Sequence, residues 1–130
     1  MSDQVVDVVR RWLSSLEQGD PAPEMCDPEV EIVNWAESPI PGPYHGHDGV
    51  RQWWADVADA FEGVRLQVMQ IEGLDAHRVL TAQRLVGTFR LTGIELDVPW
   101  GSVISVRDGK ILKAVGYISP SQARRAVGFE

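Results

Sequence analysis

The sequence has a single cysteine, three histidines and no long apolar run in its 130 residues. One cysteine, Cys26, excludes an intrachain disulfide and any metal site built from several thiolates. Cys26 lies between Met25 and Asp27, with Glu29 close by, and negative neighbours disfavour a reactive thiolate. We therefore expect a packed cysteine rather than a nucleophile. Without a membrane-spanning run or a signal-peptide pattern, the expected location is the cytoplasm.

Positive charge is also scarce, with 12 Lys and Arg against 19 Asp and Glu, for a net charge of −7. Nucleic acids and anionic membranes both require a basic face, so neither is an expected partner. The sequence contains no glycine-rich phosphate loop, nucleophile elbow or dinucleotide fingerprint. We therefore expect no cofactor. At 44% hydrophobic residues, 1–130 is long enough for one domain with its own core.

Two stretches of apolar residues at helical spacing predict two amphipathic helices. The first ends at Gly19 and the second runs from about 47–49 to Gly63, with a short turn or helical piece expected over 21–26. A third, short helix is predicted after Ser119, because Ser119, Pro120 and Gln122 form a capping pattern and Gly128 ends it. The apolar stripes of the first two helices are Val5, Val8, Val9, Trp12 and Leu16, then Val50, Trp53, Trp54, Val57 and Phe61.

Alternating apolar residues predict strands over 64–72, 77–90, 94–106 and 110–118, after a short first strand at Ile32 and Val33. Asp108-Gly109 is a strong hairpin signal between the last two strands. Helices followed by antiparallel strands favour an α+β fold. We expect a cone-like, curved antiparallel (mixed) sheet, wrapped on one face by the N-terminal helices, with a cavity where they do not reach.

The other face of that sheet needs a partner or water. Trp100, Ile104 and Val106 share one face of a strand, and Val115 with Tyr117 share one face of the next. If these faces point outward together, the apolar patch is too large for a monomer. The sequence therefore predicts a homodimer through the outer sheet face.

A proline-rich bend lies between the first strand and the second helix. Pro39, Pro41 and Pro43 fix the backbone and remove amide donors, so the bend should be stiff. Trp35 and Glu37 lie on this bend, and we expect them to border the cavity.

The order of these elements resembles the SnoaL-like, nuclear-transport-factor-2-like superfamily of cone-shaped α+β proteins, over about residues 3–128. Three segments carry the resemblance: VVRRWLSSLEQGD, GHDGVRQWWADV, and VRDGKILKAVGYIS with the following QARRAVG. Because this fold hosts many activities, the resemblance implies the fold more strongly than a reaction.

Steroid isomerases of this fold use a helix tyrosine and a protonated strand aspartic acid as an oxyanion hole, together with an aspartate base. The resemblance places the tyrosine on Trp12, the aspartic acid on Gly101 and the base near Asn34. The acid and the base are both missing, which argues against that mechanism.

The limonene epoxide hydrolase group has a bend similar to ESPIPGPYHGHDGV. The resemblance places its water-activating tyrosine and asparagine on Trp35 and Glu37, and its arginine on Gln83. Its two aspartates fall on Leu85 and Gly116. The implied site is an epoxide-hydrolase-like pocket without that group's acid–base residues.

Glu37 is the strongest catalytic candidate. Inside a pocket walled by tryptophans its pKa would rise through lost hydration, which suits a general acid or base. The alternative is a solvated glutamate pointing outward. Asn34 and Gln83 would supply neutral hydrogen bonds, while Trp12, Trp35, Phe61 and Leu85 would bind a ring-containing ligand, with Gly101 and Gly116 beside it.

Two other groups of polar residues have alternative explanations. His45, His47 and Asp48 invite a zinc site but lack a further ligand, so Asp48 is better explained as a favourable charge in a first helical turn, and no metal is expected. Asp97 is a secondary acid candidate at the cone mouth, or an ordinary surface residue.

Together these features predict a cofactor-free enzyme that uses acid–base chemistry on a small lipophilic, oxygenated ring compound, as an isomerase, cyclase or epoxide-hydrolase-like hydrolase. The alternative is a non-catalytic binding protein of the same fold.

Overall fold

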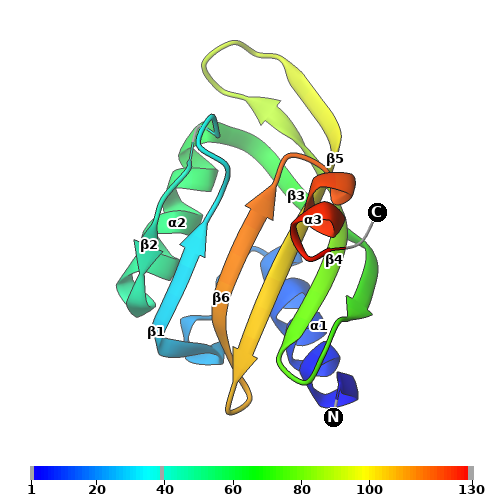
Figure 1. Ribbon diagram of the computed structural model, residues 1–130. Helices are drawn as coiled ribbons and strands as arrows, with labels where there is room; N and C mark the ends of the chain where they lie inside the picture. The colour runs from blue at the N-terminus through cyan, green and yellow to red at the C-terminus, as the bar shows by residue number, and fades with distance from the viewer. Residues whose placement is uncertain (1, 39, 129–130) are drawn as a thin grey trace.

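The computed structural model describes residues 2–38 and 40–128 (Figure 1). Helix α1 (Ser2–Glu17) is followed by the short 3-10 helix η1 (Pro23–Met25) and strand β1 (Cys26–Val33). After the bend come β2 (Tyr44–His45) and α2 (Gly46–Ala60). The chain then forms β3 (Phe61–Gly73), β4 (Arg78–Phe89), β5 (Glu95–Arg107), β6 (Lys110–Tyr117) and α3 (Pro120–Ala126).

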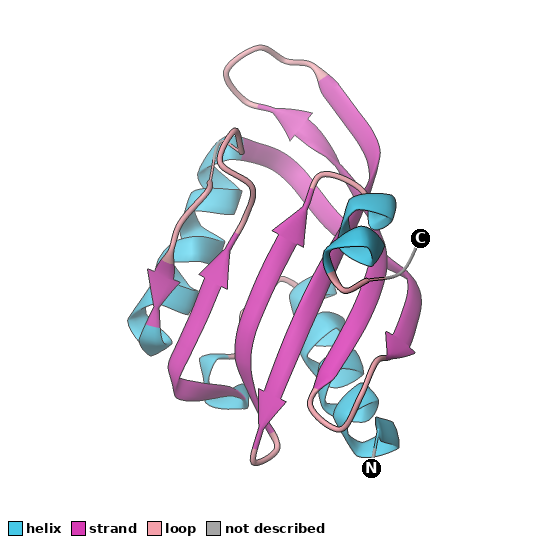
Figure 2. Cartoon of the chain, in the orientation of Figure 1, coloured by secondary structure: helices cyan, strands magenta, loops and turns pink. Residues whose placement is uncertain are grey.

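The strands form one curved sheet in the order β2-β1-β6-β5-β4-β3 (Figure 2). All neighbours are antiparallel except β1 and β6, which run parallel, so the sheet is mixed. The tight turn between β5 and β6 places Asp108 and Gly109 at positive φ, which is the conformation that an Asp-Gly pair favours. The predicted α+β fold, with helices before a curved mixed sheet, is confirmed.

Helices α1 and α2 cover one face of the sheet, whereas α3 lies on the other (Figure 1). The apolar stripe of α1 is buried as its spacing predicts, with Val9 and Trp12 at most 1% exposed. These side chains pack with Val30, Ile104 and Ile111 from the sheet, all of them buried. Full burial of one such side chain contributes about 1.5–3 kcal/mol, so this layer holds the cone together.

Helix α3 covers part of the outer face. The Ser119 hydroxyl accepts a hydrogen bond from the Gln122 amide at 3.2 Å, as its capping pattern predicts. Ala123 is fully buried against Leu80 and Val103. Gly101 permits this close approach, because a Cβ there would lie 2.8 Å from Cα of Pro120.

Two boundaries differ from the sequence prediction. Helix α2 ends at Ala60, not at Gly63, because Phe61 is extended and buried and already belongs to β3. Strand β1 begins at Cys26 rather than near Ile32. Its first five residues, CDPEV, include polar residues and a proline, and therefore do not show the pattern of a strand. Pairing with β6 stabilises this segment, and local sequence shows no such partner.

The outward apolar face expected on β5 is not formed. Trp100, Ser102 and Ile104 alternate onto the inner face, where Ile104 is 1% exposed and Val106, which follows a bulge, is 6% exposed. The outer side of β5 instead carries Gly101 and Val103 beneath α3. The homodimer therefore loses part of its basis and stays a prediction. Among the described helices, none is both long and apolar enough to cross a bilayer.

Candidate functional site

A cavity of about 460 Å³ lies at the end of the cone where the bend, α2 and the hairpin of β4 and β5 come together. Figure 1 shows this hairpin reaching past the ends of the neighbouring strands. Aromatic side chains form much of the wall: Trp35, Trp53, Trp100, Phe61 and Phe89. Aliphatic side chains complete it, among them Ile40, Val57, Leu66, Leu85, Leu96, Val98 and Ile118.

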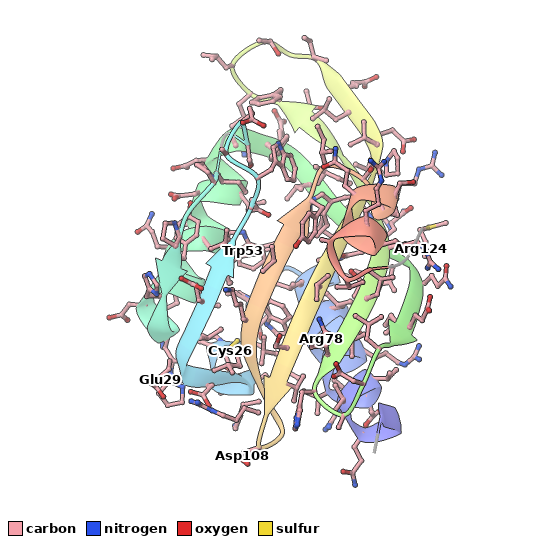
Figure 3. The ribbon with its side chains drawn as sticks, in the orientation of Figure 1. Cys26, Glu29, Trp53, Arg78, Asp108 and Arg124 are labelled. Carbon is pink, nitrogen blue, oxygen red and sulfur yellow. The ribbon has the colours of Figure 1, made fainter. Side chains whose placement is uncertain are left out.

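The aromatic walls come from different elements. Trp53, labelled in Figure 3, projects from α2 and is 4% exposed, with its ring 6.0 Å from that of Trp12. Phe61 and Phe89 face each other across β3 and β4 with ring centroids 4.9 Å apart. Trp35, Trp53 and Trp100 have no hydrogen-bond acceptor for the indole N–H within the described ranges. Any of these N–H groups that faces the cavity is available to an acceptor on a bound molecule.

Internal hydrogen bonds hold the bend in place. Asn34 makes two of them: its backbone amide donates to the Pro41 carbonyl and its Nδ2 donates to the Ile40 carbonyl, each at 3.0 Å. The Ser38 amide donates to the Trp35 carbonyl at 3.0 Å, and the Ser38 hydroxyl accepts from the Ile40 amide at 3.1 Å. Pro39, one of the three prolines expected to stiffen the bend, lies outside the described residues.

The far end of the bend is tied to α2. The Tyr44 hydroxyl donates to Asp56 Oδ2 at 2.7 Å. Burial, followed by this hydrogen bond, raises the pKa of Tyr44 to about 12, so the phenol stays protonated and keeps the bond. Gly42 has φ +77°, and a Cβ there would lie 2.8 Å from the Ile32 carbonyl oxygen, so only glycine allows the chain to turn here.

A second, much smaller void of about 20 Å³ lies next to the cavity, deeper in the cone. The two spaces share four lining residues: Asn34, Trp53, Leu66 and Trp100. We call the smaller space the inner void. Its wall also contains Trp12, Gln83, Ser102 and Gly116.

Gln83 is the most informative residue of the inner void. It is 1% exposed, and its Oε1 lies 3.0 Å from the hydroxyl oxygen of Thr81 and 3.5 Å from that of Ser102. Its Nε2 has no hydrogen-bond partner in the described part of the chain. A buried donor without a partner costs about 1–3 kcal/mol, so such a group calls for an explanation.

Eight of the residues predicted for the site border these two spaces. Asn34, Trp35, Glu37, Phe61 and Leu85 line the cavity, and Asn34 also lines the inner void with Trp12, Gln83 and Gly116. Trp12 does not offer its N–H to a ligand, because its Nε1 donates to the Pro21 carbonyl at 2.9 Å.

Glu37 lies at the exposed edge of the cavity, next to Trp35. The deep, desolvated position expected for its carboxylate is not formed, because the turn from Trp35 to Ser38 carries it to the surface. Within the described part of the chain it is the one titratable residue in the cavity wall.

Asp97 and Gly101 do not line either space, which corrects the expectation for both. Successive residues of a strand face opposite sides, and here Leu96, Val98 and Trp100 face inward. Asp97 pairs on the outer face with Arg84, whose Nη2 lies 2.8 Å from Asp97 Oδ2. Gly101 lies against α3.

Sequence reasoning missed several wall residues. The sequence prediction places Trp100 on the outer face and does not identify Ser38, Phe89, Leu96 or Val98 as wall residues. The alternation of Leu96, Val98 and Trp100 along one strand was the available signal, and a correct choice of the inward face would have found all three.

The remaining polar candidates have structural partners. Burial raises the pKa of the Cys26 thiol to about 12, so the thiolate is not accessible near neutral pH. His47 Nε2 lies 2.8 Å from the Cys26 carbonyl oxygen, Asp48 pairs with Arg51 at 2.8 Å, and His45 lies 3.7 Å from Glu31. The histidines and the aspartate of this segment thus have separate partners.

With this geometry established, comparison with known proteins identifies the family. The SnoaL-like domain family matches residues 9–114. The chain belongs to this family. A search of curated protein sequences gave no significant match.

Solved structures agree on the fold. TerC, co-crystallised with polyporic acid, is 17% identical, with a TM-score of 0.77 over 94% of this chain and 96% of that one. A hypothetical protein from Catenulispora acidiphila with a ketosteroid isomerase-like protein fold, in complex with trimethylamine, is 16% identical, with a TM-score of 0.74 over 95% of this chain and 93% of that one. A Sinorhizobium meliloti protein whose name proposes a polyketide cyclase is 15% identical, with a TM-score of 0.70 over 89% and 98%. At these identities the likeness concerns the fold.

Proposed function

We propose that this SnoaL-like domain binds a small, lipophilic ring compound in the cavity at the end of its cone. The observation that carries the proposal is the wall: three tryptophans, two phenylalanines and a set of aliphatic side chains around about 460 Å³. Ligand sites typically measure about 300–1,000 Å³ and are mostly apolar, with few polar groups. Flat rings gain most from such walls, because aromatic pairs add about 0.5–1.5 kcal/mol beyond the area they bury.

The polar groups of the site are neutral, apart from Glu37 at the edge. Asn34 and Ser38 line the cavity, and the three indole N–H groups have no acceptor within the described ranges. A neutral molecule with one or two oxygen atoms fits this wall best, because a buried charge would lack a partner. Two structural neighbours that carry a small molecule, TerC with polyporic acid and the Catenulispora protein with trimethylamine, support a ligand-binding use of the fold.

Acid–base catalysis on the bound compound is the second candidate. Glu37 is the residue that would transfer the proton, because it lies at the cavity edge and has no ion-pair partner among the described residues. A single carboxylate can take a proton from one position of a ligand and return it at another, which is the requirement of an isomerase or a cyclase. The Sinorhizobium protein, whose name proposes a polyketide cyclase, is consistent with such chemistry on this fold.

The two functions are separated by one experiment. Terpenoid, steroid and polyketide compounds are screened by thermal shift and by quenching of tryptophan fluorescence, and each binder is incubated with wild-type protein and with Glu37→Gln. Binding without product by either protein supports a binding protein. Product from wild type alone supports catalysis through Glu37. Absence of any binder across the three classes would contradict both.

A further inference from the structure

The inner void has the size and the polar partners of a site for one oxygen atom. A water molecule needs a void of about 10–15 Å³, and this one measures about 20 Å³. It lies next to the cavity and shares Asn34, Trp53, Leu66 and Trp100 with it. These four side chains lie between the two spaces, and a substituent of a ring in the cavity would pass between them to enter the void.

One hydrogen-bond donor of the inner void comes from Gln83. The Thr81 and Ser102 hydroxyls lie close to each other and to the Oε1 of Gln83, so one of their two hydrogens is donated to Oε1 and the other joins the two hydroxyls. The other end of the amide, Nε2, is buried and has no partner in the described part of the chain. With its amide in this orientation, Gln83 presents a donor to whatever occupies the void.

One acceptor faces the same void. Asn34 uses its Nδ2 to hold the Ile40 carbonyl at 3.0 Å, which leaves Oδ1 as the free end of its amide. This Oδ1 lies over the α-carbon of Gly116, another wall residue of the void. No hydrogen bond joins Asn34 to Gln83 among the described residues, so the two amides are not each other's partners.

From this arrangement we propose that the inner void is a site for an O–H group: a water molecule in the empty protein, replaced by a hydroxyl of the bound ligand. The oxygen accepts a hydrogen bond from Gln83 Nε2, and its hydrogen is donated to Asn34 Oδ1. A carbonyl or ether oxygen satisfies only the first of these bonds, and a methyl group satisfies neither. The ligand half of this inference, in which a ligand hydroxyl replaces the water, rests on the proposed function. The water half, in which a water molecule occupies the void of the empty protein, does not depend on it.

The water half is tested in the ligand-free protein. A high-resolution crystal structure is expected to show one ordered water within hydrogen-bond distance of both Gln83 Nε2 and Asn34 Oδ1. A dry void, or a water that touches only one of these atoms, overturns the proposal. This arm needs no ligand and no variant.

The ligand half is tested by calorimetric titration with two probes of similar shape, 2-naphthol and 2-methylnaphthalene. We expect wild type to bind 2-naphthol about tenfold more tightly or better, because only its hydroxyl pairs with both amides. In Gln83→Leu the ratio is expected to fall several-fold, because only the hydrogen bond to Asn34 Oδ1 remains. Leu91→Asn, a change at a 91% exposed residue that lines neither space, is the control and keeps the wild-type ratio. Equal affinity of wild type for the two probes overturns the hydroxyl site.

Two further outcomes are informative. If Gln83→Leu does not fold, Gln83→Met keeps the length of the side chain and removes the donor, and it is expected to lower the preference in the same way. If neither probe binds wild type while the water is present, the proposed binding function fails and the O–H site stands as a structural water site.

Discussion

The absence of a side chain at Gly116 leaves room for the amide of Asn34. A methyl group added at Gly116 would occupy the position of Asn34 Oδ1. A Cβ at Gly116 would collide with Asn34 Oδ1 and lie 2.8 Å from Cζ2 of Trp100. Asn34 is 9% exposed and is held by the Ile40 carbonyl, so it cannot swing away freely. The glycine on β6 therefore sets the position of the amide that borders both the cavity and the inner void.

The substitution Gly116→Ala tests this relationship. We expect it to lower the free energy of unfolding by about 1–3 kcal/mol through overpacking, and to weaken binding of 2-naphthol by displacing Asn34. Urea denaturation and calorimetry measure the two effects. Gly101→Ala is the matched control, because its Cβ would press on Pro120 and α3 on the outer face. It is expected to lower stability while leaving the affinity of the folded protein unchanged; equal loss of affinity in both variants would refute the assignment.

Asp97 provides a test of the outer face. Its side chain is 51% exposed and pairs with Arg84, away from both spaces. We expect Asp97→Asn to leave ligand affinity unchanged and to cost less than about 1 kcal/mol of stability, because exposed ion pairs contribute little. Calorimetry and urea denaturation check this. A large loss of affinity would show that Asp97 acts at the cavity mouth.

Asp27 gives the protein a defined acid sensitivity. Hydrogen bonds from Arg107, with a further one from the Glu29 amide, hold the pKa of Asp27 below its ordinary value. A lowered pKa in the folded state means that the unfolded chain binds the proton more readily. The added stability is therefore present above pH ~4, the ordinary aspartate value, and is lost as the pH falls through the folded-state pKa.

Thermal unfolding measured from pH 7 down to pH 2 is expected to show this loss, and Asp27→Asn is expected to flatten it. Asp59→Asn, a change at an exposed aspartate of α2, serves as the control and should keep the wild-type slope. An unchanged slope in Asp27→Asn would show that the acid sensitivity arises elsewhere.

The fold was predictable because its local signals agree with its tertiary structure. The stripe of α1 and the Ser119 cap are both visible in local sequence and both hold in the structure. The start of β1 was not predictable, because Cys26 to Val30 becomes a strand through parallel pairing with distant β6. Local pattern contains no information on that partner.

The site was predictable only in part, because alternation along a strand does not show which of its two faces points into the cavity. Leu85 and Gly116, placed through the resemblance, line the two spaces, whereas Gly101, also placed through it, and Asp97 lie on the outer face of β5. One choice of face moves every residue of a strand between the cavity and the exterior. The orphan donor of Gln83 could not be foreseen, because it depends on which atoms Thr81 and Ser102 reach.

The central claim is that the aromatic cavity binds a lipophilic ring, and one measurement addresses it directly. Calorimetric titration of 2-naphthol is carried out on wild type, on Leu85→Asn in the cavity wall and on the exposed control Leu91→Asn. We predict one saturable site per chain in wild type and in Leu91→Asn, with a negative heat-capacity change, and affinity about tenfold weaker in Leu85→Asn. No saturable binding by wild type, or the same affinity in Leu85→Asn, would contradict the account.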